Sequence, residues 1–157
     1  MTDNKNKLFN NLTAQIEKMA AGGADRRNIL QSICDLLRES VPGYDWVGFY
    51  LVDSEKDREL ILGPFAGEPT EHVRIPFGKG ICGRAAETED IFIVDDVSRE
   101  ENYLSCSMKV KSEIVLPIFK NGKLIGELDL DSHRMSAFGE SDKKFLKIVG
   151  DIAGSLL

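Results

Sequence analysis

Residues 112–132 read SEIVLPIFKNGKLIGELDLDS, and this stretch decides the fold. Two apolar, β-branched runs flank Asn121 and Gly122, a pair that tolerates positive φ at both central positions of a two-residue turn. The stretch therefore predicts a β-hairpin. Because side chains two apart in a strand point the same way, Asp129 and Asp131 share one face of it, and the leucines beside them fill the other.

Two aspartates in an otherwise apolar strand have two interpretations. Asp is depleted in strands and costly to bury unpaired, which favours a face that lines a pocket. The alternative is a face open to solvent, as one side of an antiparallel sheet can be.

Glu113, on the partner strand, is a candidate third carboxylate. A strict two-residue register would pair it with Leu130 and turn it away from the aspartates. A bulge near Pro117, or a frayed strand start, would turn it toward them. If the three acids meet, like charges raise at least one pKa, so that one carboxyl can act as a general acid, and the cluster would attract a ligand ammonium group.

Helices are predicted at both ends of the chain and strands in the middle. WVGFYLV, LILGPF, HVRIPF and IFIVDDV are short runs that favour strands, and ICGRAAET favours a short helix. This order predicts an α+β fold with an antiparallel sheet, the terminal helices on one face and loops on the other. The apolar positions at helical spacing are Leu8, Leu12, Ile16 and Met19, then Leu30, Ile33, Cys34, Leu37 and Val41, and finally Phe145, Ile148, Val149, Ile152 and Leu156.

Composition limits the classes of function. With 157 residues, 42% of them hydrophobic, and no segment typical of a membrane span or a secretory signal, we expect one cytoplasmic domain over residues 1–157 and no membrane partner. A net charge of −6 disfavours nucleic acid. The three cysteines do not suggest a disulfide framework, and no Cys and His cluster has ligand spacing, so no metal is expected.

Each cysteine has its own interpretation. Cys106 lies in a polar, irregular stretch near Lys109 and Lys111, where positive charge favours the reactive thiolate, and a buried, inert thiol is the alternative. Cys82, in the GKGICGR turn, could be packing alone, and Cys34 is expected in a helix core.

The remaining candidate residues are two histidines and one tryptophan. His72 and His133 have no companion at ligand spacing, which favours surface or hydrogen-bonded histidines over catalytic ones. Trp46 more often indicates core, although alternate side chains of WVGFY could form a pocket wall.

The chain resembles the free methionine-(R)-sulfoxide reductases, a stand-alone branch of the GAF fold, from about Trp46 to the C-terminus. The motifs that carry the resemblance, in order, are WVGFYLV, LILGPFAG, VRIPFGKGICGRAA, IVDDV, SEIVLPIFKNGKLIGELDLDS and the closing helix. The resemblance implies a sheet of about six antiparallel strands with helices on one side. It also implies a homodimer formed through the terminal helices.

The resemblance further implies a reaction. A thiolate at Cys106 attacks the sulfur of free L-methionine (R)-S-oxide and becomes a sulfenic acid, a second cysteine resolves it, and thioredoxin or another thiol reductant reduces the disulfide, with no bound cofactor. Glu113, Asp129 and Asp131 would hold the ammonium group and help to protonate the leaving oxygen. Trp46 would form an aromatic wall.

Two positions depart from the family pattern. His72 stands immediately before VRIP, where many members carry the resolving cysteine, so Cys82 is the other candidate if its Cα lies within about 7 Å of that of the nucleophile. Ser107 follows Cys106, where the family often has Asp. Two other functions stay open, namely a noncatalytic GAF sensor for a small amino-acid-like or nucleotide ligand and a structural dimerisation module.

Overall fold

The computed structural model describes residues 2–56, 58–100 and 109–157, whose strands form one antiparallel sheet. The strands are β1 (Trp46–Val52), β2 (Glu59–Ala66), β3 (Arg74–Pro76), β4 (Phe92–Val94), β5 (Ser112–Lys120) and β6 (Lys123–Ser132). They lie in the order β3-β2-β1-β6-β5-β4, and each neighbouring pair is antiparallel. The α+β prediction and the six strands are confirmed within these residues.

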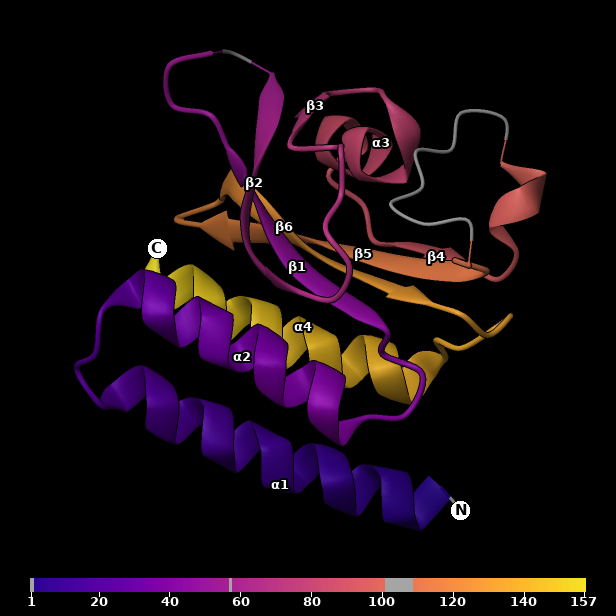
Figure 1. Ribbon diagram of the computed structural model, residues 1–157. Coiled ribbons are helices and arrows are strands. Elements are labelled where there is room, and N and C mark those ends of the chain that lie inside the picture. Colours follow the sequence, from indigo (N-terminus) through magenta and orange to yellow (C-terminus); the bar gives the residue numbers. More distant parts are fainter. Residues whose placement is uncertain (1, 57, 101–108) are drawn as a thin grey trace.

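The helices lie on both faces of the sheet. One face is covered by α2 (Arg26–Ser40) and α4 (Glu140–Leu156), and α1 (Thr2–Ala21) packs on the outer side of these two helices, whereas α3 (Gly80–Thr88) lies on the other face, beside β5 and β6 (Figure 1). A short 3₁₀ turn, η1 (Val97–Arg99), follows β4. The prediction that the terminal helices gather on one face is confirmed.

Alternation along the strands divides the buried side chains into two layers. The layer beneath the terminal helices includes Phe49, Leu128 and Leu130, which are fully buried. The layer beneath α3 includes Trp46 and Tyr50. The central strands are therefore buried on both faces, and polar side chains on the α3 side are enclosed by the fold.

The expected apolar stripe of α4 is partly wrong. Ile148 is 45% exposed, whereas Phe145, Leu146, Val149 and Ala153 are buried. The helical period of about 3.6 residues places these four on the side that faces the sheet, and Ile148 falls at its margin.

The turn between β5 and β6 has the predicted form. Lys120 pairs with Lys123, and Asn121 and Gly122 have φ values of 54° and 78°. Asparagine and glycine are the residues that adopt this left-handed region most readily, so the local sequence determines the turn.

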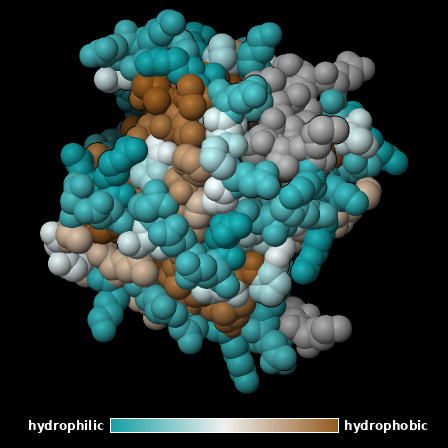
Figure 2. Space-filling view, viewed as in Figure 1, coloured by the Kyte–Doolittle hydropathy of each residue, from teal (hydrophilic) through white to brown (hydrophobic). Residues whose placement is uncertain are grey.

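None of the described helices combines the length and the apolar character that a bilayer span requires. In the view of Figure 2 the surface is mainly hydrophilic, and its hydrophobic areas form separate patches.

Candidate active site

A shift in strand register brings the predicted acids together. The pairing of β5 with β6 is irregular between Ile118 and Phe119, next to Pro117, so that Glu113 lies opposite Asp131. The bulge that the sequence left as one alternative is therefore present, and the strict register is wrong. The extra residue reverses the face on which Glu113 lies, as a one-residue slip must.

Cross-strand pairing extends this row to Trp46. Asp131 pairs with Glu113 on one side and with Trp46 of β1 on the other, so the three side chains occupy the same face of the sheet. Gly48 gives the indole its space, because a Cβ at this position would lie 2.3 Å from the Trp46 ring. The indole nitrogen donates a hydrogen bond of 2.9 Å to the carbonyl of Glu68. Trp46 is therefore held as a wall of the site.

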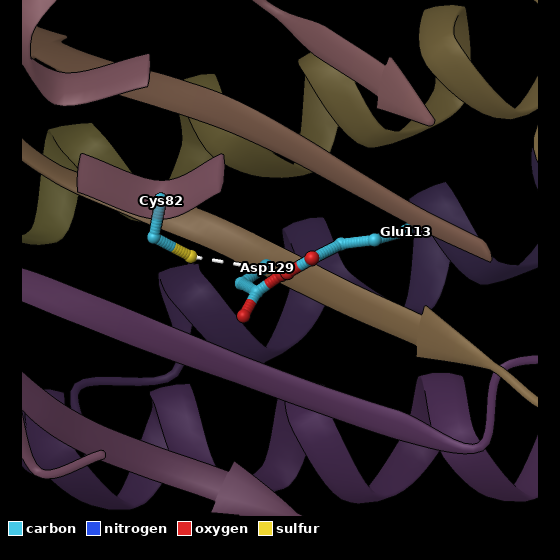
Figure 3. A group of neighbouring side chains, drawn as sticks. All are labelled: Cys82, Glu113 and Asp129. Atoms are coloured by element: carbon cyan, nitrogen blue, oxygen red, sulfur yellow. Dashed lines mark hydrogen bonds between the residues drawn. The ribbon is translucent and has the colours of Figure 1, made fainter. Parts of the chain in front are cut away.

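Cys82 approaches the acids from the first turn of α3. Its thiol donates to the carboxyl of Glu113 across 3.9 Å, and Figure 3 shows Cys82 facing the carboxyl groups of Glu113 and Asp129 on the sheet. Close packing holds this turn, because a Cβ at Gly83 would lie 2.6 Å from the carbonyl oxygen of Pro76. The helix and the sheet together thus place the Cys82 sulfur next to the carboxyl groups of Glu113 and Asp129.

These groups line a pocket of about 340 Å³, counting the space at its open mouth. Glu113, Asp129 and Asp131 are each only 4% exposed, so the pocket interpretation of the aspartate pair is confirmed and the solvent-facing alternative is wrong. The lining residues are Trp46, Tyr50, Thr70, His72, Ile75, Lys79, Gly80, Ile81, Cys82, Glu113, Asp129 and Asp131.

Burial and like charge alter the acids of the pocket. Burial raises the pKa of Glu113 well above its usual range, and the negative charges of Asp129 and Asp131 raise it further. Burial also raises the pKa of Asp129, although hydrogen bonds from Glu113 and Cys82 oppose this rise. The raised pKa favours the protonated form of Glu113, which can donate hydrogen bonds to the aspartates and act as an acid.

The same surroundings suppress the Cys82 thiolate. Burial raises the pKa of the Cys82 thiol well above its usual value, and the negative charge of Asp129 adds to the effect. A thiolate, not a thiol, is the attacking form of cysteine. Cys82 can therefore attack only if a neighbouring base accepts its proton.

Sequence reasoning missed a fourth acid on this face. Glu127 is two residues before Asp129 on β6, is 0% exposed, and pairs across β1 with Tyr50. The signal was present, because the alternation that joins Asp129 to Asp131 also includes Glu127. Glu127 lies just before the LDLD repeat, so the repeat by itself does not include it.

The Cys82 thiol and the Glu113 and Asp129 carboxyl groups can surround one small cation. One ligand atom from each lies within 4.8 Å of the others. A metal ion would require all three groups to lose protons that burial favours them keeping. An ammonium group supplies its own hydrogens to the oxygens, so it fits this protonated cluster better than a metal does.

Cys106 lies outside the described residues, which resume at Lys109. The described residues on either side of 101–108 form ion pairs with neighbouring parts of the fold. Glu100 forms an ion pair of 2.8 Å with Arg84 of α3, and Lys109 lies 3.5 Å from Glu68, whose carbonyl binds the Trp46 indole.

The other candidate residues have separate environments. Cys34 is fully buried in the helix-side core, as expected. His133 is 42% exposed and lies 3.7 Å from Asp45. His72 lines the pocket, and its carbonyl accepts a 2.9 Å hydrogen bond from the Tyr50 hydroxyl.

Known proteins share this sequence and architecture. Residues 23–157 match the GAF domain family. The chain is 42% identical to GAF domain-containing protein A of Dictyostelium discoideum over 142 residues, which cover 90% of this chain and 87% of that protein. It is 33% identical to the free methionine-R-sulfoxide reductase of Escherichia coli over 144 residues, which cover 92% of this chain and 85% of that protein.

A solved structure of a relative has a closely similar fold. The free methionine-R-sulfoxide reductase from Neisseria meningitidis, in complex with its substrate, matches with a TM-score of 0.90 and 37% identity, covering 97% of this chain and 89% of that one. Fold, sequence and the order of the motifs agree. This chain belongs to the free methionine-R-sulfoxide reductase family of GAF domains.

Proposed function

We propose that this chain reduces free L-methionine (R)-S-oxide to methionine. The observation that carries the proposal is the pocket in which a cysteine faces a cluster of buried acids. Relatives that match nearly the whole chain carry the name of this activity, which supports the proposal.

The pocket suits the amino end of a free amino acid. Glu113, Asp129 and Asp131 supply carboxyl oxygens on one face, where a substrate ammonium group would gain charge-assisted hydrogen bonds. A methionine within a peptide has no ammonium group to place there. The acids would thus select the free amino acid, while Trp46 and Tyr50 offer apolar surface to its side chain.

Cys106 is the proposed nucleophile. The ion pairs of Glu100 and Lys109 hold both flanks of residues 101–108 to neighbouring parts of the fold, which supports access of Cys106 to a bound ligand. Its thiolate would attack the sulfoxide sulfur while a carboxyl of the cluster protonates the oxygen. The products are methionine and a sulfenic acid on Cys106.

Cys82 is the proposed resolving cysteine, because His72 occupies the position of the usual one. Its sulfur would displace the hydroxyl of the sulfenic acid, forming a disulfide and water. Thioredoxin or another thiol reductant would then reduce the disulfide. We further propose that residues 1–157 act as one GAF domain in a reducing, cytoplasmic compartment. We also propose that two chains form a homodimer through α1 and α4, and sedimentation velocity would test this.

The direct test is turnover with thioredoxin, thioredoxin reductase and NADPH, comparing the (R) and (S) epimers of free methionine sulfoxide. We expect NADPH oxidation with the (R) epimer alone. Cys106→Ser should abolish it, and Cys34→Ser, which removes a core thiol away from the pocket, should retain it. Cys82→Ser should give one methionine per chain without reductant and slow multiple turnover.

Two results would change the assignment. Tight binding of methionine sulfoxide without any turnover would replace the reductase with a GAF sensor. Multiple turnover with thioredoxin at the wild-type rate in Cys82→Ser would exclude Cys82 as the resolving residue.

A further inference from the structure

Glu127 is a buried acid to which the proposed reaction gives no role. Its side chain is 0% exposed, and neither carboxyl oxygen reaches a hydrogen-bond partner among the residues that the structure describes. It is absent from the pocket lining, so it does not touch a ligand there. An apolar residue would fill this space at lower cost, so packing alone does not explain a carboxyl here.

The neighbours of Glu127 include two groups that the reaction uses. Asp129 follows it on the same face of β6, and the Cys82 thiol approaches from α3. From β1 the facing residue is Tyr50, whose hydroxyl donates to the carbonyl of His72, and from β5 it is a proline. Glu127 therefore lies behind the pocket, next to an acid and near a thiol.

This position determines the protonation of Glu127. Burial raises its pKa well above the usual range, and the negative charge of Asp129 raises it further. The Cys82 thiol offsets part of the rise, although it does not reach hydrogen-bonding geometry. The raised pKa favours the neutral, protonated form of the Glu127 carboxyl in the resting protein.

We propose that Glu127 is a positioning residue that stores one proton and exchanges it with Asp129 and with Cys82 during turnover. The proposal rests on the reductase function above and adds a residue to it. Glu127 passes its proton to the Asp129 carboxylate, which delivers it to the sulfoxide oxygen, and Glu127 becomes a carboxylate. That carboxylate then accepts the proton of Cys82 as its sulfur attacks the sulfenic acid, which supplies the base that the buried thiol requires.

The protons and electrons balance over the two steps. First, the Cys106 thiolate attacks the sulfoxide sulfur, and the oxygen takes the proton of Glu127 through Asp129. The sulfur–oxygen bond of the sulfoxide then breaks as the hydroxyl passes to the Cys106 sulfur, which leaves methionine and a neutral sulfenic acid. Next, the sulfur–sulfur bond forms and the sulfur–oxygen bond breaks. The hydroxide leaves as water with a proton from solvent, and the Cys82 proton restores Glu127. The sulfoxide is reduced, two cysteines are oxidised, and one solvent proton is consumed.

Glu127→Gln tests the store because it keeps the size of the side chain but cannot carry the proton. We expect kcat with free methionine (R)-S-oxide to fall by about tenfold or more, since assistance by a proton-transferring group is typically worth at least that much. KM should stay within about twofold, because Glu127 does not touch the ligand. The alkaline limb of the kcat profile should move to lower pH, and Glu127→Asp should recover part of kcat.

The matched control is Glu59→Gln, a largely buried strand glutamate of β2 that pairs with Lys56 and Arg74. It should leave kcat, KM and the pH profile unchanged. Urea unfolding of each variant keeps the comparison among folded proteins. A second readout needs no turnover. The resting wild-type protein should show infrared carbonyl bands of protonated, buried carboxyls at neutral pH, and Glu127→Gln should lose the Glu127 band while that of Glu113 remains.

The outcomes distinguish the proton store at Glu127 from the reductase function on which it rests. A wild-type protein without turnover rejects the reductase function. An active wild type with an unchanged kcat and pH profile in Glu127→Gln rejects the proton store. A rise in KM alone also rejects it, because Glu127 would then act in ligand binding, and so does the absence of the Glu127 infrared band.

Discussion

At the scale of single residues, the pocket is organised for chemistry at a cost in stability. Glu113, Glu127 and Asp129 are buried with raised pKa values, so each loses favourable hydration on folding. Their protonated forms reduce this cost, and the same forms can donate hydrogen bonds and protons. Removal of acidity from the cluster should therefore stabilise the fold while it weakens the reaction.

This cost makes stability depend on pH in a defined direction. The pKa of Glu113 is higher in the folded than in the unfolded protein. As pH rises above the pKa that Glu113 has in the unfolded chain, the unfolded chain loses the Glu113 proton before the folded protein does. The free energy of unfolding therefore falls by up to about 1.4 kcal/mol per pH unit for each such group. The stability that protonated Glu113 contributes is complete below its pKa in the unfolded chain. It is lost as pH rises toward its pKa in the folded protein.

We therefore expect Glu113→Gln to gain stability relative to wild type as pH increases from 5 to 8. Urea unfolding at several pH values, read as the difference between the two proteins, measures this effect. A difference that stays constant over the range would show that Glu113 is ionised in the folded state.

At the scale of secondary structure, the sequence predicted the elements better than their relative register. Asn121 and Gly122 defined their turn because the requirement for positive φ is local. The bulge that turns Glu113 toward the aspartates depends on packing across β5 and β6, and the sequence could present it only as one of two alternatives. Glu127 could have been found from alternation, whereas its burial depends on α3, which lies far away in sequence.

The junction of α1, the loop before β1 and α4 is a second arrangement that depends on distant residues. Asp142, 2% exposed at the start of α4, accepts hydrogen bonds from the Tyr44 hydroxyl at 2.7 Å and from the Lys5 ammonium at 2.8 Å. The backbone of Gly139 donates a third, at 3.0 Å. These bonds neutralise a buried carboxylate and fix the two terminal helices to each other.

Tyr44→Phe should destabilise the protein by about 1–3 kcal/mol, because it removes a hydrogen bond to a charged, buried group. Turnover per folded molecule should not change, since the junction lies on the face of the sheet away from α3. Urea unfolding together with the reductase assay checks both parts. Gln15→Ala, an exposed change on α1, serves as the control, and equal stability of the two variants would contradict the expected role of the junction.

At the scale of the whole molecule, the sheet separates a structural layer from a chemical one. The terminal helices and the apolar face beneath them form the larger core, while α3 closes the opposite face over the acids. The motifs were sufficient to identify the family and its fold. They did not show which acids share a face, because that depends on the register of a completed sheet.

The account depends most on the acids of β5 and β6 as the site of the substrate amino end. A crystal structure of Cys106→Ser with free methionine (R)-S-oxide tests this directly. The ammonium nitrogen should lie within about 3.2 Å of carboxyl oxygens of Glu113, Asp129 or Asp131, with the side chain along Trp46. A ligand bound outside this pocket, or one whose ammonium group faces solvent, would contradict the account.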